Sequence, residues 1–159
     1  MKIINILKLI ASIILCQLAG IVGSLATIPS IPTWYALLKK PSFTPPNWIF
    51  GPIWTGLYAL MGISLFMVWQ RRADHLQVKT AFIFFFLQLI LNAIWSVVFF
   101  GLRLPLLGLI DIILLWIAIL LTIQNFFKVS KMAGLLLVPY LLWVSFAALL
   151  NFSLWVLNR

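Results

Sequence analysis

Aromatic side chains at helical spacing are the residues of this sequence best suited to bind another molecule. Phe50, Trp54 and Tyr58 are four residues apart, so a helix places them on one face. Trp143 lies four residues before Ala147, and the small alanine leaves room beside the indole. Such faces offer stacking surface and indole N–H donors. They fit either plain helix packing or one wall of a ligand site.

Polar side chains inside apolar runs are a second group of candidates, because they are costly in a membrane and usually face the interior of a helix bundle. Gln88, Asn92 and Trp95 share one helical face. At 1.5 Å per residue, four residues on separate helices lie roughly 9 to 14 Å from the same membrane surface. They are Trp54, Asn92, Asp111 and Asn151. The shared depth predicts a cavity at one end of the bundle, although each polar residue alone also fits interhelical hydrogen bonding.

Signatures of polar catalysis are missing from the sequence. No His, Cys or carboxylate cluster has metal-ligand spacing, and there is no nucleophile–base pair or phosphate-binding glycine loop. Asp111 fits pairing with Arg103 or an indole N–H better than a proton relay. His75 lies in a charged loop, where we expect it to be solvated. We therefore expect no metal site and no required cofactor, and Cys16 is the single candidate ligand for a haem iron.

Composition places the chain in a membrane. The 159 residues are 65% hydrophobic and 8% charged, whereas a globular chain is about half apolar and about a quarter charged. Mean hydropathy is +1.19. The net charge of +9 is scattered between the apolar runs, which favours anchoring at lipid headgroups over nucleic-acid binding. A single cysteine excludes a disulfide framework within the chain.

Five apolar runs are long enough to cross a bilayer as helices, which takes about 20 residues each. We expect one all-α integral membrane domain over residues 1–159. Its spans are about 6–28, 46–69, 80–101, 105–125 and 133–157. The alternating segments of a β-barrel are absent. A signal peptide is the competing interpretation of the first run, but the run is longer than a signal core and no soluble domain follows it.

The loop expected at 29–45 is the most distinctive connection. It contains Trp34, Pro41 and the pair Lys39 and Lys40, and Pro45-Pro46 can open the following helix. We expect a structured lid in which Trp34 and Pro41 touch a ligand. Anchoring of Trp34 and of the lysines at headgroups is the alternative.

Small residues recur every four positions on the first run, at Ser12, Cys16, Gly20 and Ser24. Such a face lets another helix approach closely, either within the chain or in a dimer.

Basic residues also bias the orientation. With five spans, seven Lys and Arg fall on the side of the N-terminus and four on the other, which favours a cytoplasmic N-terminus. The seven are Lys2, Lys8, Arg71, Arg72, Lys79, Lys128 and Lys131. Asp74 and His75 share the loop of Arg71 and Arg72.

Four stretches carry a specific pattern in their order and spacing. They are WYALLKKPSFTPPNWIFGPIWTGLY (34–58), QLILNAIWSVVFF (88–100), PLLGLIDIILL (105–115) and PYLLWVSFAALLN (139–151). These stretches resemble the tryptophan-rich sensory protein family, which includes the mitochondrial translocator protein (peripheral benzodiazepine receptor). With the five-span layout, the resemblance covers nearly the whole chain.

The resemblance implies a five-helix bundle, often a homodimer, with a cavity capped by the first loop. It implies porphyrins such as protoporphyrin IX, isoquinoline carboxamides and benzodiazepines as ligands. The expected ligand-binding residues are Ser24, Trp34, Pro41, Trp54, Tyr58, Gln88, Asn92, Trp95, Asp111, Trp143 and Ala147. Trp54 and Trp143 match a tryptophan pair to which light-dependent protoporphyrin breakdown is ascribed in bacterial members, so they are candidate catalytic residues. Cholesterol recognition is not carried over, because Phe152 stands in place of the tyrosine that the animal motif needs.

We therefore expect a membrane receptor for porphyrins and for drugs of those two classes, with a sensory or stress-regulatory role. A tetrapyrrole transporter and a light-dependent porphyrin-degrading enzyme are the alternatives. The absence of an internal repeat counts against the transporter. The expected setting is a bacterial cell (inner) membrane, where the chain is surrounded by lipid and forms a homodimer.

Overall fold

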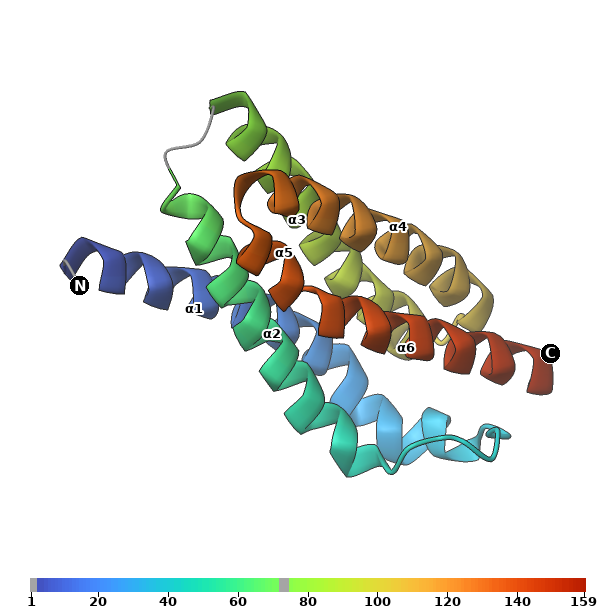
Figure 1. Cartoon of the computed structure of the whole chain (residues 1–159). Coiled ribbons are helices and arrows are strands. Elements are labelled where there is room, and N and C mark those ends of the chain that lie inside the picture. The colour runs from blue at the N-terminus through green and yellow to red at the C-terminus, as the bar shows by residue number, and fades with distance from the viewer. Residues whose placement is uncertain (1–2, 72–74) are drawn as a thin grey trace.

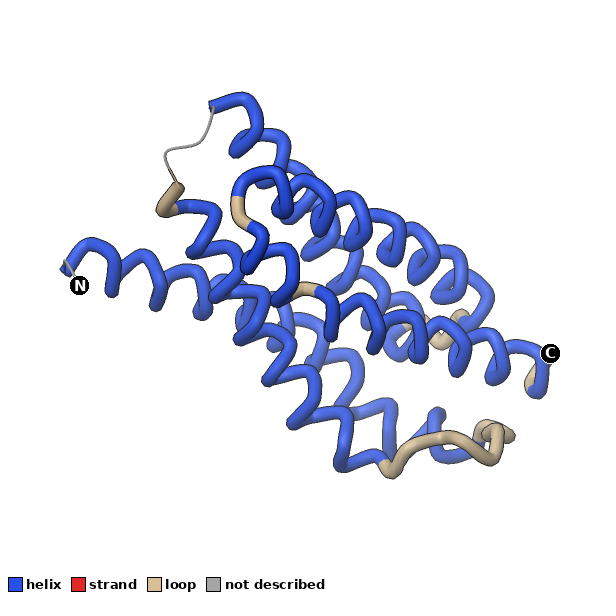
Figure 2. The backbone as a smooth tube through the Cα atoms, in the orientation of Figure 1, coloured by secondary structure: helices blue, strands red, loops and turns tan. Residues whose placement is uncertain are grey.

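Helices account for nearly all of the structure, a computed structural model that describes residues 3–71 and 75–159 (Figure 1). The elements are α1 (Ile3–Ser30), the π-helix η1 (Ile31–Tyr35), α2 (Asn47–Trp69), α3 (His75–Ser96), the π-helix η2 (Val97–Gly101), α4 (Pro105–Val129), α5 (Lys131–Leu136) and α6 (Val138–Leu157). They form five segments long and apolar enough to cross a membrane, as expected. No strand occurs among the described residues (Figure 2). Lys2, Arg72 and Asp74, which entered the charge count, lie outside these ranges.

The first span is longer than the sequence indicated. We expected it to end near residue 28, but α1 runs through Pro29 to Ser30 and continues directly into η1. A proline ring clashes with the carbonyl four residues earlier in an α-helix, and the wider π turn relieves that crowding. Thr33 also donates its hydroxyl to the carbonyl of Pro29 over 2.8 Å. The irregular connection is therefore shorter than the 29–45 loop that we expected.

The other spans differ at their ends and in one interior position. α3 begins at His75 rather than near Thr80, because hydropathy locates the apolar stretch and not the helical turn that extends into water. The last span is two helices, α5 and α6, instead of one. Pro139 supplies no backbone N–H at the second position of α6, which favours a break immediately before it.

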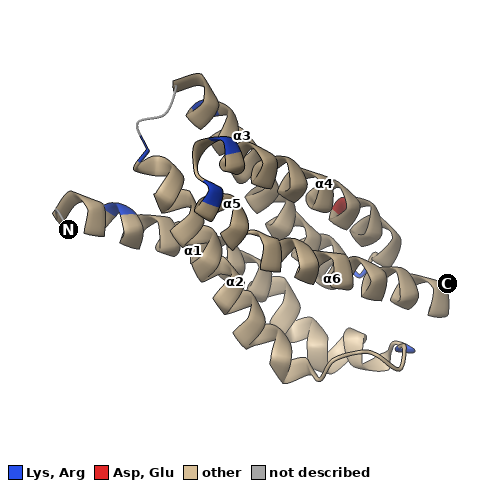
Figure 3. Cartoon of the chain, in the orientation of Figure 1, with Lys and Arg blue, Asp and Glu red and all other residues tan. Residues whose placement is uncertain are grey.

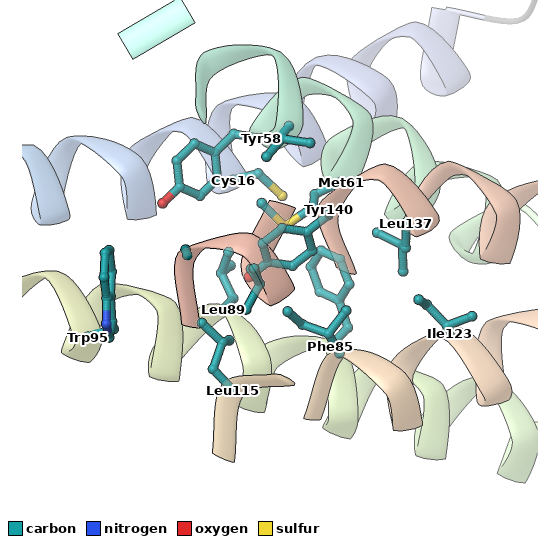
Figure 4. Packing of buried hydrophobic residues seen from close by; sticks show 14 of the residues in the cluster. Cys16, Tyr58, Met61, Phe85, Leu89, Trp95, Leu115, Ile123, Leu137 and Tyr140 are labelled. Carbon is teal, nitrogen blue, oxygen red and sulfur yellow. The ribbon is translucent and has the colours of Figure 1, made fainter. Parts of the chain in front are cut away.

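Close packing dominates the half of the bundle opposite the loop. Phe85 and Phe126 are fully buried and stack with centroids 5.6 Å apart. Figure 4 shows Phe85 and Met61 in the buried cluster that surrounds Tyr140. A Cβ atom added to Gly62 would lie 2.6 Å from the Cα of Ile13, so α1 and α2 touch backbone to backbone there. Glycine is thus a steric requirement of this crossing.

α1 changes its neighbour along its length. It packs on α2 where Gly20 meets the ring of Tyr58, and further on Gly23 faces Ser96 at the end of α3. Ser12 and Cys16 are buried within the chain. The small-residue face therefore serves packing inside one chain, and its role in a dimer stays a prediction.

Charged side chains lie mainly toward the ends of the helices and in the connections between them (Figure 3). Asp111, the only acidic residue within the described ranges, lies inside α4. Many apolar side chains on the outer faces are exposed, for example Ile10 and Leu18 on α1. This distribution suits a bundle whose sides contact lipid and whose ends contact water.

Candidate functional site

A cavity of about 440 Å³ lies at the end of the bundle that holds the loop. Its walls come from α1, η1, α2, the end of α3 with η2, and α6. Its volume falls within the range of roughly 300–1,000 Å³ that is usual for small-molecule sites. Rings make up much of the lining: Trp48, Phe50, Trp54, Tyr58, Trp95 and Trp143.

The cavity exists because α2 and α6 diverge toward the loop. α2 packs mainly against α1 and α5, while α6 packs mainly against α4. Figure 1 shows the first turns of α2 and the last turns of α6 well apart. Between them, Phe50 meets Trp143 edge to face with centroids 6.0 Å apart. Trp54 contacts Tyr58 at 5.6 Å and Tyr140 at 6.2 Å, so aromatic contacts bridge α2 and α6 along one side of the cavity.

The opposite side of the cavity is more open. Its rim includes Ile21 and Ile28 on α1 and Trp48 on α2, which are 54%, 67% and 73% exposed. α1 and α2 separate on this side beyond the contact of Gly20 with Tyr58. The opening therefore faces the flank of the bundle that carries exposed apolar side chains.

One buried hydrogen-bond donor of a lining residue has no partner within the protein. The indole Nε1 of Trp143 is buried and makes no hydrogen bond. By contrast, Nε1 of Trp95 donates to Oδ1 of Asn151 over 3.1 Å. Buried polar groups are nearly always paired, so the free N–H of Trp143 is an exception within a residue that lines the cavity.

Asn92 lies behind the cavity wall and not on it. Its Oδ1 accepts a hydrogen bond from the hydroxyl of Tyr58, and its Nδ2 donates to the hydroxyl of Tyr140 over 2.8 Å. The amide is buried and joins α2, α3 and α6. Asn92 therefore fixes the position of Tyr58, which does line the cavity.

Gln88 and Asp111 also lie away from the lining. Gln88 is fully buried, and its Nε2 is 3.8 Å from the sulfur of Met61. Oδ2 of Asp111 is buried without a partner, and no ion pair joins the carboxyl to Arg103. The pairing that we expected for Asp111 is therefore wrong. Arg103 instead occupies the tight turn between η2 and α4, where it has a positive φ of 60°.

The loop is fastened to the far end of the chain. The backbone N–H of Lys39 donates to Oδ1 of Asn158 and the carbonyl of Lys39 accepts from Nδ2, each over 2.9 Å. Phe43 of the loop also meets Phe146 of α6, with centroids 6.2 Å apart. Nothing in the sequence marked Asn158, which looked like part of a short tail, because a contact between residues so far apart has no local signal.

Trp34 supports the cavity indirectly. It lies in η1 and packs edge to face on Phe99 at 5.6 Å, and Phe99 in turn lines the cavity. Its neighbour Tyr35 is itself on the lining, with the ammonium of Lys40 4.8 Å from its ring centre.

The structure thus brings together six of the residues that we expected at a ligand site. Those on the lining are Ser24, Trp54, Tyr58, Trp95, Trp143 and Ala147. Those off the lining are Trp34, Pro41, Gln88, Asn92 and Asp111. The analysis of the sequence missed Gln17, Thr27, Tyr35, Asn47, Trp48 and Ser96 as lining residues. The spacing of Gln17 and Thr27 on the same face of α1 as Ser24 was the available signal for two of these contacts.

No group of three or more His, Cys, Asp or Glu that could hold a metal ion occurs in residues 3–71 and 75–159. Apart from the aromatic rings, the lining offers hydroxyl and amide groups such as Ser24, Thr27 and Asn47. The site is thus built for stacking and a few hydrogen bonds.

Comparison with known proteins agrees with this architecture. The TspO/MBR family matches residues 12–156. The chain is 52% identical over 155 residues to the tryptophan-rich protein TspO of Archaeoglobus fulgidus, covering 97% of this chain and 99% of that protein. It is 37% identical over 123 residues to the translocator protein of Homo sapiens, covering 77% and 73% of the two chains. It is also 37% identical over 125 residues to the tryptophan-rich sensory protein of Cereibacter sphaeroides, covering 79% and 77%. With its five spans and its tryptophan-lined cavity, the chain belongs to the TspO/MBR family of membrane proteins.

Proposed function

We propose that this protein is a membrane receptor that binds porphyrins, with protoporphyrin IX as the type ligand, and that binding serves a sensory or stress-regulatory role. The observation that carries the proposal is the aromatic cavity with its unpaired donor at Trp143. A flat apolar ring system gains most from stacking on indole and phenol rings, at about 0.5–1.5 kcal/mol per contact beyond the area buried. The cavity provides such rings from α2, α3, η2 and α6.

The polar groups suit the acidic and carbonyl groups of the expected ligands. The N–H of Trp143 can donate to a carboxylate of a porphyrin or to the carbonyl of an isoquinoline carboxamide. Lys40, which stacks on the lining residue Tyr35, can place its ammonium near a propionate at the mouth of the cavity. Lys39 precedes it in the same loop and has an exposed side chain.

A titration of the purified protein with protoporphyrin IX in the dark tests the proposal. We expect saturable quenching of tryptophan fluorescence and a shift of the porphyrin absorbance band. Trp143→Phe should weaken binding roughly tenfold, because it replaces the indole by a smaller ring and removes an indole N–H that has no partner within the protein. Trp155→Phe is the matched control, since Trp155 lies on the same helix outside the lining. Equal affinities of wild type and Trp143→Phe would contradict the placement of the site.

Light-dependent breakdown of the bound porphyrin is a second candidate function. Its support is that Trp54 and Trp143 line the same cavity. Illumination of the saturated complex should then bleach the porphyrin faster than illumination of the Trp54→Phe and Trp143→Phe complexes at equal occupancy. Identical bleaching in all three complexes would contradict the breakdown function and leave receptor function as the only proposal.

We further propose that the protein resides in a bacterial cell (inner) membrane and functions as a homodimer. The five apolar spans and the exposed apolar sides of the bundle support the membrane setting. Crosslinking in native membranes, compared with the mass of the protein in detergent, tests the dimer.

A further inference from the structure

A second concave site lies at the end of the bundle opposite the aromatic cavity. It is a surface groove of about 560 Å³ formed by Arg71, just beyond α2, and by the first three turns of α3. Arg71 is held in place there by the hydrogen bond from its backbone N–H to the carbonyl of Val68, 3.1 Å long. We refer to this site as the α3 groove. Its lining is Arg71, His75, Val78, Lys79, Phe82, Ile83 and Phe86.

The α3 groove changes character along its length. Its outer end carries Arg71, His75 and Lys79, all exposed. Its inner end is apolar and includes Ile83 and Phe86, which are 56% and 40% exposed. The change occurs within about two helical turns, which is the distance over which a membrane passes from headgroups to acyl chains.

Nothing in the described part of the chain neutralises the basic end. Arg71 and Lys79 form no ion pair there, and Asp111, the only described carboxylate, lies in α4 nearer the other end of the bundle. Asp74 lies outside the described residues. Within the described residues, the two positive charges of Arg71 and Lys79 therefore have no carboxylate partner, and the apolar strip beside them is exposed.

We propose that the α3 groove binds an anionic phospholipid. The phosphate lies between Arg71 and Lys79, with His75 as a third hydrogen-bonding group, and one acyl chain lies along Val78, Phe82 and Phe86. Guanidinium and ammonium groups bind phosphate through charge-assisted hydrogen bonds, and basic residues beside a span attract anionic lipid. A soluble phosphate compound would leave the apolar strip uncovered, so the lining as a whole fits a lipid. This site is independent of the proposed porphyrin function, because the two sites share no residue.

Native mass spectrometry of the detergent-purified protein with added phosphatidylglycerol tests the proposal, with phosphatidylcholine as the neutral lipid. Arg71→Gln/Lys79→Gln removes both charges, and we expect occupancy by phosphatidylglycerol to fall on the order of tenfold. Lys128→Gln/Lys131→Gln is the matched control, because it removes the same charge at the same end of the bundle outside the groove. The control should retain lipid as wild type does. Equal losses in both double variants would show general charge attraction, and no loss in either would also overturn the proposal.

A second variant tests the apolar strip. Ile83→Ser keeps every charge and should lower phosphatidylglycerol occupancy several-fold through lost acyl contact, while an equal change at Ile110, exposed on α4, should not. If Ile83→Ser instead converts a dimer to a monomer, the groove is an interface between two copies and the lipid proposal fails. Circular dichroism confirms that each variant keeps its helical content, and unchanged protoporphyrin titration of Arg71→Gln/Lys79→Gln confirms that the aromatic cavity is intact.

Discussion

The two halves of the bundle both contain aromatic side chains, but these side chains serve different structural roles in each half. In the half opposite the loop, Phe85 and Phe126 stack at 5.6 Å with no exposed surface, and Gly62 lets α1 touch α2. In the half beside the loop, Phe50 and Trp143 meet edge to face, and a cavity opens next to them. Aromatic rings close the core where helices converge and leave a lined space where helices diverge. The helix path therefore decides what an aromatic stripe does.

The largest expected effect is a loss of stability when a buried ring is removed from the closely packed half. Phe85→Ala should destabilise the protein on the order of 3 kcal/mol, because it leaves a void in a fully buried stack that a packed interior does not refill. Phe152→Ala is the control, since that ring is 48% exposed. Thermal unfolding in detergent, followed by circular dichroism, measures both. If Phe85→Ala proves as mild as Phe152→Ala, the two halves do not differ in packing as described.

Two glycine-to-alanine substitutions, each adding one methyl group, compare the packing of the two halves more directly. Gly62→Ala should cost about 1–3 kcal/mol, because the new Cβ meets backbone atoms of Ile13 that cannot turn away. Gly51→Ala, in a lining residue with no atom within 4 Å of the added Cβ, should be neutral or should stabilise α2 by up to about 1 kcal/mol. Opposite signs in one unfolding assay are the expected result. Equal destabilisation by both would mean that the cavity half is as tightly packed as the other.

A smaller effect is expected from loosening the loop at the cavity end of the bundle. Asn158→Ala removes both hydrogen bonds to Lys39, and at about 1 kcal/mol each we expect bound protoporphyrin to leave roughly tenfold faster or more. Stopped-flow release in detergent measures this rate. Asn125→Ala is the control, because its amide bonds only within α4. Faster hydrogen exchange at the amide of Lys39 should accompany the change, and it reports on the loop even if porphyrin does not bind.

The depth of a residue along the membrane normal could be predicted from the sequence. The direction in which its side chain points around the helix axis was harder to predict. Trp54 lines the cavity as its depth predicts, because span limits fix how far a residue lies below the surface and its face is marked by neighbours at helical spacing. Asn92 has a similar depth, but the hydroxyls of Tyr58 and Tyr140 hold it behind the wall. A polar side chain can face either of two neighbouring helices. The choice depends on where the helices cross, for example at Gly20 and Gly62. Those contacts arise only in the folded chain.

Some features had no counterpart in any local pattern. Trp48 lies on the cavity rim, because α1 and α2 separate there. The fastening of Lys39 by Asn158 joins residues that are far apart in the sequence at one end of the bundle, and it needs the whole fold to form. By contrast, the five-helix architecture was predictable because each span carries its own hydropathy signal.

The π-helix η2 affects how the cavity wall can change during evolution. A π turn contains about one residue more than an α turn, so η2 carries one residue that a regular helix would not need. Removing one residue within Val97–Gly101 would restore regular winding, leave α4 undisturbed, and turn Phe99 or Phe100 away from the cavity. A deletion there can therefore reshape the cavity without changing a side chain on the other walls.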